Sequence, residues 1–428
     1  MSEPLACGHE GAQGHSRLCA HLVGVEEAGY ARVLRGVRLE SDMCCVECAR
    51  RVKAGENIEW LRVCQACVAA LDENEWDLRE WIGQPGVAEG PMAFDATLQS
   101  LTVPDVAFAV AFCPLSSQRL LAFGNDALFL IGVDGVEAVC DVTLPVEKDE
   151  AWGGHHLAPR LHVSPDERFA ALCHDFGRFG VVVDLGTRAI TMRLDKGAYR
   201  PEHTPFPLAF FRFEEKTLLV HATDWNRLDV SDPATGELFS TREPTSYSHG
   251  EERPAHYLDF FHGQLHVSPD QNWIADDGWV WAPVGVVASW SLRAWMETNV
   301  WEAEDGPTRR SVCGRDYLWN APVAWVDCEH LAVWGIGHDD IAMLSGARVF
   351  RVADGQETAQ FAGPGQDAFF GGNGRVFSLE NDGLHVWDAQ SGAVGANRRI
   401  PPALATRRLF DRAPCEHAPV VELAPRFQ

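Results

Sequence analysis

The sequence predicts a mainly β fold in two parts: a small cysteine-rich module, followed by a long series of short antiparallel sheets. Three observations indicate this division. Cysteine and histidine pairs gather in the first 67 residues, one hexapeptide occurs twice, and short hydrophobic runs alternate with Asp- and Gly-containing turns in the rest of the chain. With 46% hydrophobic and 23% charged residues, the 428-residue chain has the composition of a folded protein and not of a disordered one.

Two C-x2-C pairs are the strongest motif of the first part. Cys45 and Cys48 form one pair, Cys64 and Cys67 form the other, and fifteen residues separate them. This spacing is typical of a four-thiolate zinc site, in which each pair binds the metal at about 2.3 Å and the chain between them returns the second pair. Cys44 is an alternative to Cys45, which we prefer because it leaves the usual gap before Cys48.

A second set of matched pairs lies upstream. Cys7 and His9 form a C-x-H pair, Cys19 and His21 form another, and nine residues lie between them, with His15 as a spare ligand. Two thiolates and two imidazoles complete a tetrahedral shell, so these pairs predict a second zinc site. Because protein ligands fill all four positions of both sites, both zinc ions are expected to be structural and not catalytic.

The segment after the last cysteine pair predicts a helix. Apolar residues recur at roughly helical spacing from residue 68 to residue 82, and Gly83 ends the pattern. A zinc knuckle followed by a helix resembles zinc-ribbon and treble-clef modules. A stretch rich in Gly and Pro comes next. We therefore expect a zinc-binding α+β module at residues 1–82 and a linker at residues 83–94.

Charge, cysteine placement and hydropathy limit the partners and the compartment. A net charge of -25 disfavours nucleic acid, because the chain repels phosphate. The longest apolar stretches are far shorter than the roughly 20 residues of a membrane helix, and the N-terminus lacks the pattern of a secretion signal. Seven of the thirteen cysteines lie between Cys7 and Cys67, which favours metal over disulfides. We expect a reduced, cytoplasmic protein without membrane or nucleic-acid partners.

A repeated hexapeptide, Leu-His-Val-Ser-Pro-Asp, predicts repeating units in the second part. It occurs at residues 161–166 and 265–270, and the offset of 104 residues fits two units of about 52 residues. Each copy lies between two hydrophobic runs, as a turn lies between two strands. Similar turn-and-strand units occur elsewhere, which makes six in total.

A second kind of turn follows several of these units, beginning at Asp184, Asp232, Asp354 and Asp388. An aspartate at a turn start accepts a backbone N–H two residues on, and four short strands joined by such turns make a propeller blade. The region from residue 95 to residue 428 therefore resembles a WD40-like β-propeller, with Trp387-Asp388 as the best local match.

The resemblance implies a closed ring of blades. Most units lack the Gly-His and Trp-Asp dipeptides, and their spacing is irregular and often longer than the usual 40 to 45 residues, so the resemblance extends to WD40-like propellers without a subfamily. Seven blades are the first choice and six the second. The seventh blade would join residues 407–423 to residues 96–103 and so bring the two ends of the propeller region together.

A propeller presents loops and a central funnel to its partners, while its fold alone names no function. Four tryptophans in an expected irregular insertion at residues 276–320, namely Trp279, Trp281, Trp290 and Trp295, are candidates for a surface that binds a protein or peptide. The alternative is that these side chains fill the core between sheets.

No pattern of catalytic residues stands out in the sequence. His155, His156 and His162, with Asp339 and Asp340, are weaker candidates for a metal in the funnel. We therefore expect a non-catalytic adaptor or scaffold. Two alternatives stay open: a propeller enzyme or ligand sensor with a funnel site, and a ligase-like factor that combines a zinc module with a WD40 propeller. The ligand spacing does not match a RING pattern, which weakens the ligase hypothesis.

Overall fold

The computed structural model describes residues 109–393 with short gaps, two further strands at residues 98–101 and 420–423, and parts of the region 16–67. The gaps in the long stretch are residues 117–118, 133, 147–156, 248–249, 282, 338–342, 366–368 and 381–382. In the N-terminal region the described residues are 16–23, 30–34, 41–45, 48, 51, 58–64 and 67. The predicted helix at residues 68–82 and the predicted linker at residues 83–94 lie outside them.

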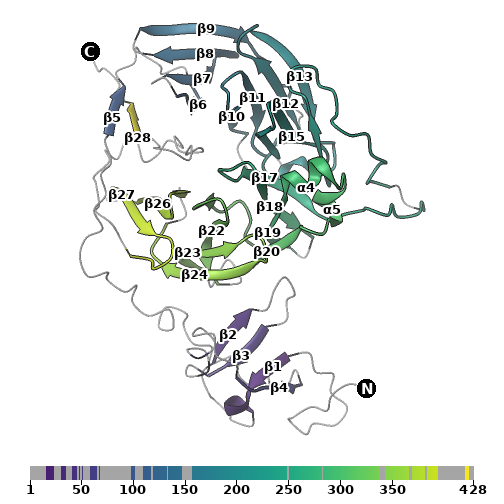
Figure 1. The fold of residues 1–428 in the computed structure, drawn as a ribbon, viewed down its shortest axis with the longest axis vertical. Helices are drawn as coiled ribbons and strands as arrows, with labels where there is room; N and C mark the ends of the chain where they lie inside the picture. Colours follow the sequence, from purple (N-terminus) through teal and green to yellow (C-terminus); the bar gives the residue numbers. More distant parts are fainter. Residues whose placement is uncertain are drawn as a thin grey trace.

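Seven sheets in the described part of the chain form a ring (Figure 1). Six of them are antiparallel, with three or four strands each, and every strand pairs with its neighbour in sequence. This is the architecture of a β-propeller, so the predicted WD40-like fold is confirmed, with seven blades and not six. The strands of these six blades are β6 (Ala111–Pro114), β7 (Leu120–Gly124), β8 (Ala127–Gly132), β9 (Gly135–Asp141); β10 (Pro159–Val163), β11 (Phe169–His174), β12 (Phe179–Asp184), β13 (Ala189–Asp195); β14 (Leu208–Phe213), β15 (Lys216–Asp224), β16 (Arg227–Ser231); β17 (Phe261–Val267), β18 (Trp273–Val280), β19 (Val284–Ser291), β20 (Arg310–Asp316); β21 (Val323–Trp325), β22 (His330–Ile336), β23 (Leu344–Arg351), β24 (Gln356–Ala362); β25 (Phe369–Gly372), β26 (Arg375–Glu380) and β27 (Gly383–Asp388).

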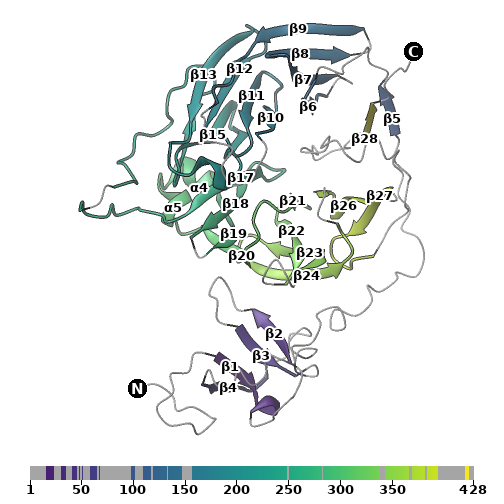
Figure 2. The same ribbon diagram turned by 180° about the vertical axis from the view of Figure 1, so that it is seen from behind.

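The seventh sheet joins the two ends of the propeller region. Strand β28 (Val420–Leu423) pairs with β5 (Leu98–Leu101), and the two lie between the first and the last of the other six blades (Figure 2). The predicted closure is therefore confirmed. The pairing is parallel, with Val420 opposite Leu98, whereas all pairs in the other six blades are antiparallel.

The repeated hexapeptide forms the turn between the first and second strands of two blades. In one copy Ser164 Oγ donates to Asp166 Oδ1 at 2.6 Å and accepts the backbone N–H of Phe169 at 2.9 Å. In the other, Ser268 makes the same two bonds, to Asp270 and from Trp273, at the same distances. The two copies thus lie two blades apart, as their spacing predicts, because β14–β16 stand between them.

Neighbouring blades pack face to face, so an inner strand buries both of its sides. Along β11, Ala170 and Leu172 face one hydrophobic cluster while Phe169 and Ala171 face another. Alternate side chains of a strand point to opposite faces, so a strand between two blades needs apolar residues at almost every position. This is why the middle strands of the repeats read as continuous hydrophobic runs.

The blade made of β14–β16 departs from the pattern. Among the described residues its outer edge has only one bridge, Ser231 to Leu238, where four of the other blades have a fourth strand. Arg242 anchors the segment that follows, since its guanidinium contacts Asp229 Oδ1 at 2.7 Å and Glu304 Oε2 at 2.8 Å with almost no exposure. Glu304 belongs to the next blade, so these ion pairs connect the two.

Two short helices lie beside this incomplete blade. α4 (Leu292–Glu297) and α5 (Glu302–Asp305) connect β19 to β20, and buried side chains from both helices join the core that β14–β19 share. The region 276–320 therefore consists largely of strands and helices, and the prediction of an irregular insertion there is wrong. None of the helices among the described residues is long and apolar enough to cross a membrane.

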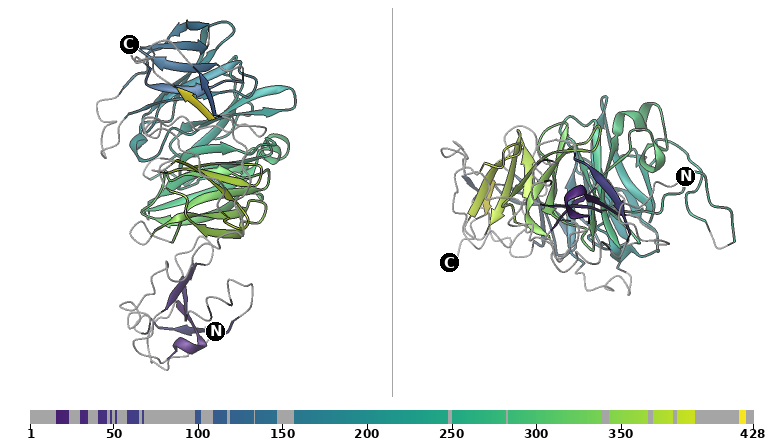
Figure 3. Two further views of the ribbon diagram at one scale, coloured as in Figure 1. Left: turned by 90° about the vertical axis from the view of Figure 1, so that its left-hand side faces the viewer. Right: turned by 90° about the horizontal axis from the view of Figure 1, so that it is seen from below.

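The N-terminal region forms a separate small sheet outside the ring (Figure 3). Its strands follow the order β2-β3-β1-β4, in which β1 runs parallel to β3 and antiparallel to β4. Eight buried residues make up its described core, and three of these are cysteines. The elements are β1 (Ser16–Cys19), a 3-10 turn η1 (Ala20–Leu22), β2 (Ala31–Leu34), β3 (Ser41–Cys44) and β4 (Trp60–Val63).

Candidate metal centre and aromatic face

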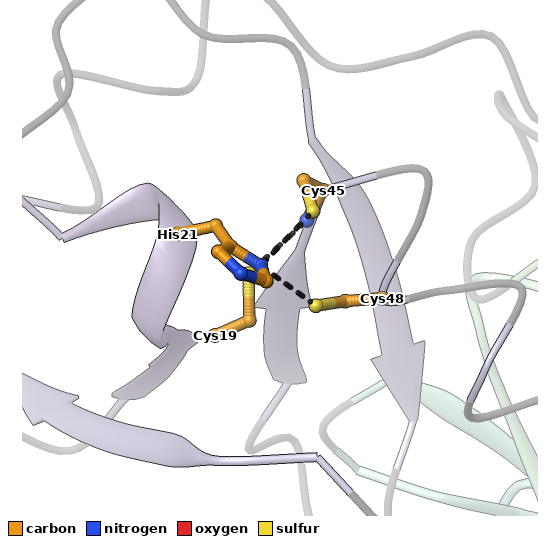
Figure 4. Close-up of side chains that lie close together, drawn as sticks. All are labelled: Cys19, His21, Cys45 and Cys48. Carbon is orange, nitrogen blue, oxygen red and sulfur yellow. Dashed lines mark hydrogen bonds between the residues drawn. The ribbon is translucent and has the colours of Figure 1, made fainter. Parts of the chain in front are cut away.

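One cluster of metal-ligating side chains lies in the described part of the N-terminal sheet. Its members are Cys19, His21, Cys45 and Cys48, whose ligand atoms all lie within 4.8 Å of one another. Cys19 ends β1, His21 follows in η1, and Cys45 comes directly after β3, so the parallel pairing of β1 with β3 brings the two chain segments together. Figure 4 shows the imidazole of His21 pointing toward the cysteines.

The distances within this cluster fit a tetrahedral zinc ion. His21 Nδ1 lies 3.1 Å from Cys48 Sγ and 3.7 Å from Cys45 Sγ. Sulfur at about 2.3 Å and nitrogen at about 2.0 Å from zinc would be about 3.5 Å apart across a tetrahedral edge, a value between the two distances. In addition, the backbone N–H of Cys45 donates to Cys19 Sγ at 3.3 Å, which stabilises a thiolate there. Three sulfurs and one imidazole nitrogen are a donor set that suits zinc.

The crowding of thiols in this cluster favours a bound cation. Burial, together with the neighbouring Cys45 and Cys19, raises the pKa of Cys48 to about 12. Three sulfurs so close together cannot all lose their protons unless a positive charge compensates them. A divalent cation supplies that charge and releases the protons.

The grouping of ligands differs from the one predicted from the sequence. The second C-x-H pair, Cys19 with His21, lies with the first C-x2-C pair, whereas the sequence assigned these two pairs to different zinc sites. Cys64 and Cys67 do not join this cluster, although their sulfurs lie 3.7 Å apart. Sequence spacing measures only separation along the chain, and here the sheet pairing decides which pairs meet.

The remaining ligand predictions concern Cys7, His9 and the choice between Cys44 and Cys45. Cys7 and His9 lie outside the described residues. The preference for Cys45 over Cys44 agrees with the structure, since Cys45 is in the cluster while Cys44 is fully buried in the small hydrophobic core. The alternation of side chains at the end of β3 separates these neighbours.

The four candidate tryptophans of the partner surface lie in two places. Trp290 on β19 and Trp295 on α4 are buried and pack against each other, with ring centroids 5.9 Å apart. They fill the core between blades and are not available to a partner in this structure. Trp279 at the end of β18 is also buried, but it contacts Trp281 in the next turn, which is 48% exposed.

Trp281 belongs to a continuous group of rings that we call the aromatic face. Tyr199 contacts Trp225 and Phe261, Phe261 contacts Trp281, and the centroid distances range from 5.2 to 5.9 Å. The members of this group are Tyr199, His203, Trp225, Tyr247, Tyr257, Phe261, Trp279, Trp281 and Trp319. Three of them, Tyr199, Trp281 and Tyr247, are more than 40% exposed.

Strand order explains why these rings meet. In a four-stranded antiparallel blade, the start of the first strand, the turn between the second and third, and the end of the fourth lie at the same face. Phe261 starts β17, Trp225 lies in the turn after β15, and Tyr199 follows the end of β13. The sequence analysis missed these three residues, because finding them requires the strand position of each ring and not its residue type.

Most of the residues considered for a funnel metal cannot be placed in the described part of the chain. His155, His156, Asp339 and Asp340 lie outside the described residues. His162 is on β10, and no metal-ligating group that includes it occurs among the residues with a described position.

Among known proteins, only solved structures match this chain, at 11–12% identity. No protein-family model matches this sequence, and no curated protein matches it. Among solved structures, a chain of the mitotic checkpoint complex is 11% identical over 74% of this chain and 87% of that chain, with a TM-score of 0.43. The C-terminal WD40 domain of Sif2 is 12% identical over 72% of this chain and 76% of that chain, with a TM-score of 0.39. BamB from Moraxella catarrhalis is 11% identical over 71% of this chain and 77% of that chain, with a TM-score of 0.40. The fold assignment rests on the sheets themselves.

Proposed function

We propose that this protein is a non-catalytic adaptor that binds a protein or peptide partner on the aromatic face of its propeller. The observation that supports this is the group of nine rings, linked by contacts, with Tyr199, Tyr247 and Trp281 open to solvent. An exposed Trp costs free energy in water, and large aromatic side chains at the centre of a contact contribute most of the binding free energy of many protein complexes.

We also propose that two zinc ions stabilise the N-terminal module. One is bound by Cys19, His21, Cys45 and Cys48, whose positions fit a tetrahedron. The second is bound by the remaining two pairs, Cys7 with His9 and Cys64 with Cys67.

We also propose that the protein is cytoplasmic, and the proposed zinc ligands support this. The 3.7 Å separation of Cys64 Sγ and Cys67 Sγ suits one edge of a zinc site, and six of the eight ligands are thiols. Thiolate ligands must stay reduced, so we place the protein in the cytoplasm. All four positions of each site are filled, which makes the zinc ions structural.

The adaptor proposal is tested by affinity purification of the full-length protein from lysate of its native host, with zinc in the buffers. Three forms are compared by mass spectrometry: wild type, Trp281→Ala, and Phe239→Ala as a control. Phe239 is 46% exposed, close to the 48% of Trp281, but it contacts none of the nine rings by any interaction found in the described residues.

A stoichiometric partner that is retained by Phe239→Ala and lost by Trp281→Ala supports the proposal. A partner that is bound equally by all three forms places the contact elsewhere and contradicts it. Turnover of a small molecule by the purified protein would favour the enzyme alternative instead.

A further inference from the structure

The connection between β16 and β17 is long for a link between neighbouring blades. It spans residues 232–260, whereas residues 196–207 and 317–322 suffice at two other junctions of the ring. No fourth strand uses this length, since β14–β16 form a blade of three strands. Only the start of the connection, at Leu238 and Phe239, bonds to the edge of β16. The rest of the connection is therefore available for another role.

The side chain of Arg242 takes the place of a fourth strand where the connection leaves the sheet. The carbonyl of Val230 on the outer edge of β16 accepts the N–H of Phe239 at 2.7 Å. Two residues away, the carbonyl of Leu228 faces the same edge and accepts a hydrogen bond from the guanidinium of Arg242. A side chain thus satisfies this edge, and the chain continues to the next blade.

The connection then contacts Trp301, which lies at the start of α5 in the next blade. The imidazole of His256 stacks on this indole, with centroids 4.2 Å and planes 12° apart, and its Nδ1 donates to Asp305 Oδ2 at 2.9 Å. The guanidinium of Arg242 lies 4.8 Å from the centroid of the same indole. Stacked rings attract each other, and so do a cation and a ring. We call Arg242, His256, Trp301 and Asp305 the clasp.

The clasp holds the part of the connection that carries two rings of the aromatic face. Tyr247 precedes His256 along this segment, and Tyr257 follows it directly. The ring centroid of Tyr257 lies 5.1 Å from that of Tyr247 and 6.3 Å from that of Trp225, in the turn after β15. The clasp therefore places two tyrosines from the connection beside a ring from the blade that precedes it.

A second anchor limits what loss of the clasp would free. Asn226 Nδ2 donates to the carbonyl of Leu258 at 2.9 Å, so the chain after Tyr257 is also attached to the turn after β15. Without the clasp, we expect the residues before Leu258 to loosen and Trp225 to keep its position.

We propose that His256 is a positioning residue for partner binding, because its contacts with Trp301 and Asp305 hold Tyr247 and Tyr257 in the aromatic face. This inference rests on the adaptor function proposed above. Tyr247 is 42% exposed and so is available to a partner. A ring that is already held in place loses less conformational entropy on binding than a ring on a loose segment, and the affinity for the partner is higher for that reason.

Fluorine NMR of the full-length protein, labelled with 3-fluorotyrosine and purified with zinc in the buffer, tests the clasp without a partner. The chain has five tyrosines, and a Phe variant of each assigns its signal. His256→Ala should move the signals of Tyr247 and Tyr257 toward that of free 3-fluorotyrosine and leave the signal of Tyr199 unchanged. The backbone amides of residues 250–257 should also exchange about tenfold faster, because a stacking contact and a hydrogen bond are lost.

Two further variants separate the clasp from a general loss of stability. His330→Ala removes a histidine of another blade, whose Nδ1 lies 3.0 Å from Asp327 Oδ2, and should change neither measurement. His256→Phe keeps a ring against Trp301 without the hydrogen bond to Asp305, so it should restore most of the protection from exchange. Both histidines are partly exposed, so the propeller should melt as in wild type in all three variants.

The role in binding is measured by the affinity purification proposed above, with wild type, His256→Ala and His330→Ala side by side. His256→Ala should retain the partner of the wild type about threefold less or weaker still, because only the held conformation presents both rings. His330→Ala should retain it fully.

Unchanged tyrosine signals in His256→Ala would overturn the clasp, and a His256→Phe variant as loose as His256→Ala would reject the stacked pair as its main contact. Moved signals with full retention of the partner would overturn the role in binding. If the wild type recovers no partner, the adaptor function fails and the positioning role fails with it, whereas the clasp itself is still decided by the tyrosine signals.

Discussion

The N-terminal module and the core between blades β14–β16 and β17–β20 are stabilised in different ways. The described core of the module has eight buried residues, three of them cysteines, whereas the core between those two blades has eighteen buried apolar residues that include Trp290 and Trp295. Apolar burial contributes about 25 cal/mol per Å2, so the larger core can stabilise its blades without help. A core of the smaller size needs a metal or another cross-link. The comparison teaches that packing can stabilise the ring, whereas the N-terminal module is the region where the proposed zinc ions would contribute most.

The largest expected effect is the loss of zinc from the module. Cys48→Ser should remove one zinc ion and destabilise the module without releasing the other ion, because metal binding supplies on the order of 10 kcal/mol of folding free energy in small zinc domains. The ring should keep its own thermal transition. Mass spectrometry measures the zinc content of the protein. Calorimetry measures the melting transitions of the module and of the ring separately.

The same variant distinguishes the two possible groupings of ligands. If the structure groups them correctly, the zinc ion that remains in Cys48→Ser has three sulfur ligands and one nitrogen, from Cys7, His9, Cys64 and Cys67. If the grouping inferred from sequence spacing holds, the remaining ion has two sulfurs and two nitrogens. X-ray absorption at the zinc edge reads this composition directly, and the second result would contradict the assignment.

A smaller effect is expected in the core of the ring. Trp290→Ala should lower the free energy of unfolding of the propeller by about 3–5 kcal/mol, as expected when a fully buried large side chain is removed. Trp290→Phe is the matched control, since the indole N–H of Trp290 has no hydrogen-bond partner among the described residues. Chemical denaturation of both variants should show a large loss for Ala and a small one for Phe. Equal losses would mean that burial of the ring is not what stabilises this core.

The repeated turns should each contribute less than the core. Ser164→Ala and Ser268→Ala each remove a hydroxyl that accepts a backbone N–H and donates to an aspartate, so each should cost about 1–2 kcal/mol. Because the bond lengths at the two sites are the same, the two losses should also agree. Urea denaturation measures both. A clear difference between them would show that the surrounding blade, and not the turn, sets the cost.

The smallest effect depends on pH. Burial alone would raise the pKa of Asp184, but hydrogen bonds from the N–H groups of Thr187 and Gly186 and from Arg168 outweigh it, and its pKa lies below the usual value. Its folded pKa is thus lower than its unfolded pKa of about 3.9, so its contribution is complete above that pH and is lost as the pH falls through the folded pKa. Asp184→Asn should cost about 1 kcal/mol at pH 7, and the difference from wild type should shrink below about pH 4.

Much of the fold could be predicted because its signals are local. The hexapeptide at residues 161–166 and 265–270 marks equivalent turns, since a serine and an aspartate two residues apart form the same bonds wherever they occur. The closure of the ring was also predictable, because β28 and β5 occupy the ends of the repeat region. The sequence did not indicate which candidate tryptophans reach the surface, because residue type does not reveal whether a strand lies between two blades or ends at a face.

The sequence by itself determined the repeat architecture, the position of its turns and the Cys and His pairs that are candidates to hold a metal, because each depends on neighbours within a few residues. Only the tertiary structure decided which cysteine and histidine pairs lie together, which of Trp279, Trp281, Trp290 and Trp295 reach the surface, and which rings join them. These outcomes depend on the pairing of β1 with β3 and on the packing of one blade against the next. Such contacts join residues far apart in the chain, and spacing along the chain carries no record of them.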